Sequence, residues 1–149
     1  MQYLTFKLNG VEYAVDVKIV ESVVEYSGAT EVPTPLPYMR GVMDLRGSVI
    51  PLIDLRKKLG LPQSEDLVGT SVIVFSVSGG EGAGKNLVVG ALVDGVSEVL
   101  TIEEAAHGET VALWERYVSG VVRYGGRMIV MIEAGWLFSI EEIAVLSAA

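Results

Sequence analysis

A glycine-rich run near the middle of the chain, SGGEGAGKN, is the first segment whose residue types could support chemistry. Residues 79–86 come one residue short of G-x-x-x-x-G-K-[ST], a loop that cradles the phosphates of a nucleotide. Asn86 stands where that pattern requires the Ser or Thr that ligates magnesium. Such a loop must also open a helix, whereas the following LVVGALVDG is rich in β-forming residues. We therefore expect a hairpin loop, and we keep a nucleotide-binding enzyme that uses Gly79–Lys85 as an alternative function.

His107 is the one histidine of the chain. Glu103, Glu104 and Glu109 follow or precede it closely, but one imidazole with scattered carboxylates is a weak ligand set, and no cysteine adds a thiolate. Any nucleophile that needs a histidine would have to use this residue. No pair of carboxylates stands in an apolar setting, as a general acid and base would. The sequence therefore predicts no catalysis, no metal and no cofactor.

Arg46 is a candidate for binding a partner, not for catalysis. It stands in the turn Arg46-Gly47-Ser48 between the apolar segments YMRGVMDL and VIPLIDL. A guanidinium presents five donors in a planar fork, so an Arg held on a rigid hairpin can bind an anionic group of a partner. The structural alternative is an ion pair with Asp44 or Asp54, which at a surface is worth about 0–1 kcal/mol.

Short strands separated by glycine make up most of the chain. Polar and apolar residues alternate on both sides of Asn9-Gly10, which predicts a hairpin with a type I′ turn. Pro33, Pro35 and Pro37 predict an ordered surface connector, because proline cannot donate to a sheet. Besides the two strands that flank Arg46, further strands are predicted over residues 20–26, 71–77, 87–93, 96–102, 120–124 and 127–133.

Two short helices are also predicted. Asp54 can cap a helix that ends at Gly60, with Pro62 beyond it. Ser139 and Glu142 have the spacing of a capping box, so the C-terminus from Trp136 should be helical. Trp114 and Trp136 are expected to anchor the core.

An internal repeat relates the two halves of the chain. At an offset of 79 residues, five identities pair Gly41, Val42, Gly47, Ile50 and Ile53 with Gly120, Val121, Gly126, Ile129 and Ile132. At an offset of 76, three more pair Val17, Val20 and Val23 with Val93, Val96 and Val99. Chance similarity between strand–Gly–strand patterns is the alternative. The economical architecture is one domain over residues 1–149, with two β-barrel subdomains near 1–70 and 71–149 and the chain passing between them.

Composition excludes several classes of partner. The 149 residues carry a net charge of −8 and a pI near 4.6, which disfavours nucleic acid and anionic membrane surfaces. No apolar run reaches the ~18 residues that span a bilayer, and the N-terminus lacks the pattern of a signal peptide. Half of the residues are apolar, which fits either a dense β core or an apolar surface kept for partners. We expect a cytoplasmic protein.

The segment around Arg46 resembles the core signature of the CheW family, the small adaptors of bacterial chemotaxis. That signature, roughly G-V-x-N-L-R-G-x-x-x-P-x-x-D-L-R, stands here as GVMDLRG followed by Pro51, Asp54, Leu55 and Arg56. Asp44 replaces the usual Asn, which should preserve the turn but adds a negative charge beside Arg46. The resemblance extends from TFKLNGVEYAVDV to GGRMIVMIE, nearly the whole chain.

The resemblance implies a mainly β fold of two SH3-like five-stranded barrels packed together. It implies a non-enzymatic scaffold that couples the cytoplasmic helical tip of a chemoreceptor to the regulatory domain of the histidine kinase CheA. The positions that the resemblance assigns to the receptor groove are Val20, Gly41, Arg46, Gly90, Val96 and Val99. Candidates for the kinase interface are Val23, Leu45, Glu104 and Val111. A CheW-like regulatory domain cut from a larger kinase or receiver fusion is the alternative within the family.

Overall fold

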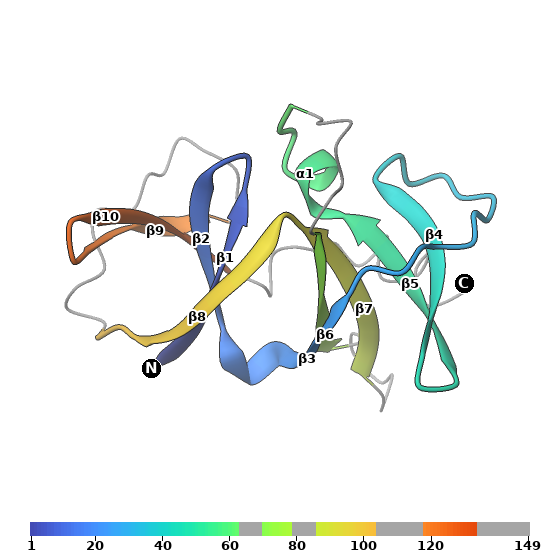
Figure 1. Cartoon of the computed structure of the whole chain (residues 1–149), viewed down its shortest axis with the longest axis horizontal. Helices are drawn as coiled ribbons and strands as arrows, with labels where there is room; N and C mark the ends of the chain where they lie inside the picture. The colour runs from blue at the N-terminus through green and yellow to red at the C-terminus, as the bar shows by residue number, and fades with distance from the viewer. Residues whose placement is uncertain (63–69, 79–85, 104–117, 134–149) are drawn as a thin grey trace.

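The described residues form two five-stranded sheets with short helical segments, which agrees with the predicted mainly β fold (Figure 1). The computed structural model describes residues 1–62, 70–78, 86–103 and 118–133. Sheet A has the order β8-β1-β2-β10-β9, with β1 (Gln2–Leu8), β2 (Val11–Asp16), β8 (Gly95–Thr101), β9 (Val118–Tyr124) and β10 (Arg127–Ile132). Sheet B has the order β3-β6-β7-β5-β4, with β3 (Val20–Glu25), β4 (Met39–Leu45), β5 (Ser48–Asp54), β6 (Ser71–Ser78) and β7 (Asn86–Val93).

The two sheets follow one pairing plan. In each sheet the central hairpin is antiparallel, β1–β2 in sheet A and β6–β7 in sheet B. One outer strand, β8 or β3, runs antiparallel to that hairpin. A second hairpin, β9–β10 or β4–β5, joins through a parallel pair, β10 with β2 or β5 with β7. The predicted internal repeat is therefore also a repeat of topology.

The register of the two outer hairpins agrees residue by residue. Val42 pairs with Pro51 in sheet B, and the positions 79 residues further on, Val121 and Val130, pair in sheet A. Each hairpin also skips one residue of its first strand, Arg40 in β4 and Ser119 in β9. Because bulges are specific features of a strand and not random defects, a bulge at equivalent positions supports a true repeat over chance similarity.

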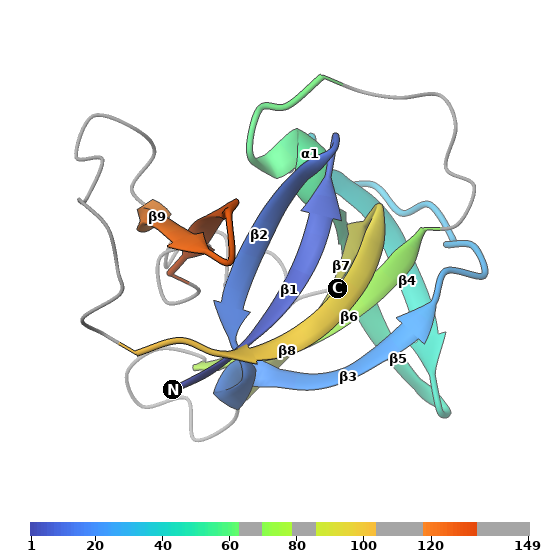
Figure 2. The same ribbon diagram turned by 60° about the vertical axis from the view of Figure 1, so that its left-hand side comes forward.

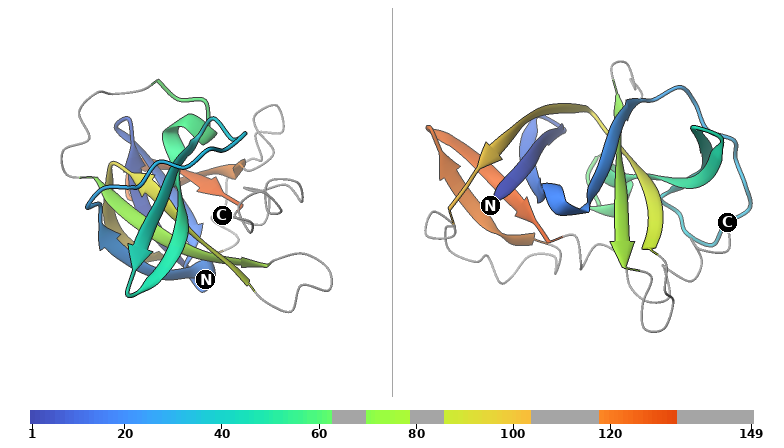
Figure 3. Two further views of the ribbon diagram at one scale, coloured as in Figure 1. Left: turned by 90° about the vertical axis from the view of Figure 1, so that its right-hand side faces the viewer. Right: turned by 90° about the horizontal axis from the view of Figure 1, so that it is seen from below.

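The strands of the two sheets do not divide at residue 70. β6 and β7 lie beyond that point and share sheet B with β3, β4 and β5, whereas β8, β9 and β10 join β1 and β2. The chain crosses from sheet A to sheet B at the 3₁₀ helix η1 (Val17–Ile19) and returns at Asp94, between β7 and β8. The sequence halves are thus repeats, while each sheet takes strands from both. Figure 1 and the view from below in Figure 3 show the two sheets side by side.

Three clusters of buried side chains hold this arrangement together. The central core lies between the sheets and receives Leu4, Phe6 and Leu8 from β1 together with Ile73, Phe75 and Val77 from β6. The sheet A core includes Tyr3, Ala14, Val122 and Ile129, and the sheet B core includes Met43, Leu52, Val72 and Val74. β1 and β6 therefore bury both faces. Phe6 and Phe75 are each 1% exposed, and burial of one such side chain stabilises the fold by roughly 1.5–3 kcal/mol.

Local sequence signals explain the ends of the elements. Asn9 and Gly10 both have positive φ, at 51° and 78°, which is the predicted type I′ turn. The side chain of Asp54 accepts hydrogen bonds from the amides of Arg56 and Lys57, and so caps α1 (Leu55–Lys58) as expected. Gly60, at φ 73°, ends that helix, and the amide of Leu61 donates to the carbonyl of Arg56 at 2.8 Å.

Several predictions fall outside the described residues. They concern the C-terminal helix from Trp136, the positions of Trp114 and His107, and the conformation of the glycine-rich loop. Closure of each sheet into an SH3-like barrel stays a prediction. In the part of the chain that the structure describes, no helix is long and apolar enough to span a membrane.

Candidate functional site

Arg46 occupies a strained and exposed turn. It has φ 51° and is followed by Gly47 at φ 88°, so the β4–β5 hairpin has the two positive φ values of a type I′ turn. Gly or Asn serves such a position with little strain, whereas Arg pays about 1 kcal/mol or more there. The equivalent residue of sheet A, at 46 + 79, is Gly125, with φ 55°. An Arg kept where a glycine would fit better points to a function for its side chain.

The guanidinium of Arg46 is also free within the described residues. Its side chain is exposed, and no hydrogen bond or ion pair joins it to Asp44 or Asp54 there. Asp54 is turned to α1 and lies 3.8 Å from Arg56 Nε. The described residues therefore do not show the ion pair that was the structural alternative for Arg46.

Val20 and Val96 both pack against the central core, although they lie on strands of different sheets. Val20 begins β3 and pairs with Phe75, while Val96 lies in β8 and pairs with Phe6. Both valines are partly buried and pack against the central core. They are equivalent positions of the repeat, 76 residues apart, on the strands that enter each sheet just after a crossing point.

Val23 and Val99 continue the same two strands toward solvent. Val23 is 43% exposed and Val99 is 52% exposed, and they too are equivalent by the offset of 76. Figure 2 shows β3 and β8 together on the near side of the molecule. The two strands therefore present matched apolar side chains, a partly buried pair and an exposed pair. We call these four valines the β3–β8 surface. Val23, which was predicted for the kinase interface, lies on the same strand as the receptor candidate Val20.

Gly41 is covered by the chain itself. Thr30 of the proline-rich connector exchanges two backbone hydrogen bonds of 2.9 Å with Val42, and the connector lies over Gly41. A Cβ on Gly41 would lie 2.1 Å from the carbonyl oxygen of Thr30, and φ is 137°. The physical reason for glycine here is the close approach of the connector to β4.

Gly90 is buried inside sheet B. A Cβ at this position of β7 would meet Val72 Cγ1 at 3.0 Å, Leu52 Cδ1 at 3.2 Å and Met43 Sδ at 3.3 Å. All three belong to the sheet B core, so Gly90 faces away from solvent. Leu45 also packs against that core and is only partly exposed. Glu104 and Val111 lie outside the described residues.

The last residues of the P-x-x-D-L-R motif form an ion-pair group that the sequence did not predict. Arg56 is 2% exposed, and its Nη1 lies 3.4 Å from Asp94 Oδ1. The other carboxylate oxygen of Asp94 accepts a 2.7 Å hydrogen bond from the amide of Asn9. The motif spacing suggested the helix cap, but no sequence signal connects residue 56 with residue 94.

The structure bears on the metal site and the phosphate-binding loop that the sequence left as alternatives. No group of three or more His, Asp or Glu side chains is placed to hold a metal in the part of the chain that the structure describes. The residues that follow the glycine-rich loop form strand β7, so the helix that a phosphate-binding loop must open does not follow it. Burial raises the pKa of Tyr13, whose ring stacks on Phe6 with centroids 5.8 Å apart, but this side chain belongs to the central core.

Comparison with known proteins places the chain in a family. The model of the CheW-like domain matches residues 2–142. The chemotaxis protein CheW of Rhizobium meliloti is 32% identical over 95% of this chain and 89% of its own length. That of Thermotoga maritima is 32% identical over 97% and 90%. The crystal structure of the scaffolding protein TtCheW from Thermoanaerobacter tengcongensis superposes with a TM-score of 0.79 at 26% identity, covering 95% of this chain and 94% of that one. The chain belongs to the CheW-like domain family.

Proposed function

We propose that this protein is a chemotaxis adaptor that joins the helical cytoplasmic tip of a chemoreceptor to the histidine kinase CheA. It performs no chemistry, and its action is geometric, because one rigid body holds two partners at a set distance. The observation that carries the proposal is Arg46 within the family signature, which is strained, exposed and without a partner among the described residues. The matched valines of the β3–β8 surface support it.

The receptor helix would lie on the β3–β8 surface. An amphipathic helix binds through apolar side chains spaced along one face, and exposed valines on two strands suit that mode. Val23 and Val99 would contact the helix, while the partly buried Val20 and Val96 would support them from below. Gly41 and Gly90 would act indirectly, by keeping β4 and β7 in place. Arg46, in the turn after the edge strand β4 of sheet B, would bind an acidic group of the same receptor or of its neighbour.

CheA would bind elsewhere on the same body, through a regulatory domain built on the same plan as this chain. Leu45, at the end of β4, and the segment that contains Glu104 and Val111 are the candidate contacts. Two partners on separate surfaces allow the adaptor to pass a conformational preference from receptor to kinase.

A pull-down with a receptor cytoplasmic fragment and CheA, each alone and then together, tests the proposal. We expect Arg46→Glu and Val99→Glu to lose the receptor and to retain CheA. Arg123→Glu and Val49→Glu are the matched controls, because Arg123 is exposed without a described partner and Val49 is 66% exposed. Receptor binding by Arg46→Glu at the wild-type level would contradict the role of Arg46.

Arg46→Asn separates function from stability more sharply. Asn tolerates positive φ, so this variant should be as stable as the wild type or more stable by about 0.5–1 kcal/mol, while the receptor contact is lost. A variant that unfolds less readily and binds less well cannot be explained by damage to the fold. If neither partner binds the wild-type protein under any condition, the adaptor function itself fails.

A further inference from the structure

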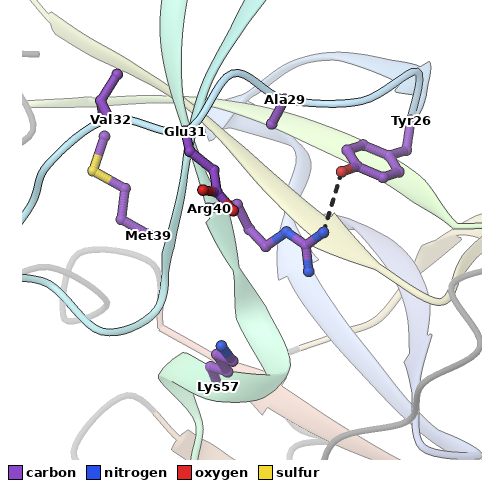
Figure 4. Close-up of a pocket in the computed structure, with 7 residues that line it drawn as sticks. All are labelled: Tyr26, Ala29, Glu31, Val32, Met39, Arg40 and Lys57. Atoms are coloured by element: carbon purple, nitrogen blue, oxygen red, sulfur yellow. Dashed lines mark hydrogen bonds between the residues drawn. The ribbon is translucent and has the colours of Figure 1, made fainter.

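A second cationic site lies at the other end of β4, in a pocket of about 340 Å³ between the connector, the start of β4 and α1 (Figure 4). Tyr26 and Glu31 of the connector, Arg40 of β4 and Lys57 of α1 supply its polar groups. Apolar side chains of the connector and β4 complete the lining. This volume is at the lower end of the range for pockets that hold small ligands.

A bulge aims Arg40 into this pocket. In the β4–β5 pair the register passes from Met39–Ile53 to Gly41–Leu52, so Arg40 has no residue opposite it. Bulges of this kind turn a side chain out of the regular alternation of a strand. Sheet A has the same bulge at Ser119, whose hydroxyl donates to the carbonyl of Met131 at 3.4 Å. The repeat therefore preserves the bulge, and only sheet B places a guanidinium there.

Tyr26 holds that guanidinium in position. Arg40 Nη2 donates a hydrogen bond of 3.3 Å to Tyr26 Oη, and the guanidinium carbon lies 5.9 Å from the centroid of the tyrosine ring. Figure 4 shows the two side chains meeting across the pocket wall. The hydrogen-bond donors at Nε and Nη1 have no acceptor among the described residues. The result is a fork that is already oriented and still has free donors, which lowers the cost of binding a planar anion.

The charges in the pocket favour a group with one negative charge. Lys57 is exposed, and neither it nor Arg40 forms an ion pair with Glu31 or another carboxylate in the described part of the chain. Two cations and one carboxylate leave a local charge of about +1 in a protein whose net charge is −8. A carboxylate would neutralise this charge, whereas a phosphate dianion would exceed it and meet the repulsion of Glu31.

We propose that Arg40, Lys57 and Tyr26 form a binding site for the side-chain carboxylate of an Asp or Glu on a protein partner. A protein side chain is favoured over a free small molecule because Lys57 and Glu31 are exposed, so a small ligand would bury little of its surface. The site is distinct from that of Arg46, which lies in the turn just after β4, six residues beyond Arg40 and about 20 Å away along extended chain. The proposed carboxylate site does not depend on whether the β3–β8 surface binds a receptor.

Titration followed by NMR of the arginine Nε–Hε groups tests the site directly. The probe is a capped hexaglutamate peptide, with capped hexaglutamine and inorganic phosphate as comparisons, and Arg40→Lys assigns the Arg40 signal. We expect a saturable shift of the Arg40 signal with hexaglutamate and none with hexaglutamine. Lys57→Gln should weaken binding about threefold, and Lys18→Gln, an exposed lysine outside the pocket, should leave it unchanged.

Three outcomes would overturn the proposal. The first is the absence of a saturable shift at Arg40 with hexaglutamate. The second is an equal effect of Lys57→Gln and Lys18→Gln, which would show only a general attraction to positive charge. The third is tighter binding of phosphate than of the glutamate peptide. Backbone amide spectra of each variant establish that the fold is retained, because both lysines are exposed.

Discussion

Arg56 Nη1 lies 3.4 Å from Asp94 Oδ1, and this ion pair connects α1 to the residue at which the chain leaves sheet B for sheet A. Asp94 also accepts a hydrogen bond from the amide of Asn9, and its own amide donates to the carbonyl of Lys7 at 3.1 Å. The side chain of Asn9 donates to the carbonyl of Pro62 at 2.9 Å. Four chain segments from both sheets thus meet at one polar junction beside the central core.

Asp94→Ala should destabilise the fold by about 3 kcal/mol. It leaves the buried Arg56 with Asp54 alone, at 3.8 Å, and removes the acceptor of the Asn9 amide. The figure is at the low end for breaking a buried pair, because the side chain of Asp94 is 30% exposed. Urea unfolding measures it, with Asp44→Ala as the control, since Asp44 is exposed and should change stability by less than about 0.5 kcal/mol. Equal stability of the two variants would mean that the junction does not hold the sheets.

Gly41→Ala should displace the connector from β4. The new Cβ would lie 2.1 Å from the carbonyl oxygen of Thr30, a backbone atom that cannot move alone. Gly47→Ala is the matched control, because it also has positive φ but meets nothing within 4 Å, and it should cost only about 1–2 kcal/mol. Hydrogen exchange at the amides of Thr30 and Val42 reports the contact directly. Unchanged protection of both amides in Gly41→Ala would contradict this account of Gly41.

Gly90→Ala should cost about 1–3 kcal/mol by overpacking the sheet B core. The added methyl would press on Val72, Leu52 and Met43 at 3.0–3.3 Å. Gly95→Ala is the comparison, because a Cβ there meets nothing within 4 Å and its φ is not positive, so it should stabilise the protein by about 0.4–1 kcal/mol. Thermal unfolding of both variants measures these changes in stability. Wild-type stability of Gly90→Ala would contradict the buried position of Gly90 and favour its predicted role as a surface contact.

Alkaline pH should destabilise the fold through Tyr13. Its pKa is raised in the folded protein because burial disfavours the charged tyrosinate, while the unfolded chain has the ordinary value of 10.0. The folded state therefore holds its proton more tightly, and stability falls as the pH rises above about 10 toward the folded pKa. Tyr13→Phe should flatten this fall in urea unfolding followed from pH 8 to 11. A Tyr13→Phe protein that loses stability as steeply as the wild type would exclude Tyr13 as the cause.

The hairpins, the helix cap and the repeat could be read from the sequence because each depends on local geometry. Asn9-Gly10 needs two residues that accept positive φ, and Asp54 needs only free amides at the start of α1. The repeat was visible because glycines and apolar residues recur at a constant offset. The signature around Arg46 also indicated an exposed arginine, because the residue types at a few consecutive positions determine a turn.

Burial and long-range contact decided the rest of the site. Nothing in the sequence distinguishes Gly41 and Gly90 from glycines at the surface. In the structure, Gly41 lies under the connector and Gly90 lies inside sheet B. Arg40 gave no signal, because a bulge depends on the register of two strands. The sequence by itself determined a two-sheet repeat with an arginine at one hairpin. Only the tertiary structure decided that the chain crosses between the sheets before β3 and before β8. These crossings set Val20 and Val96 against the central core and bring Arg56 to Asp94, because pairings between distant segments depend on packing that no local pattern encodes.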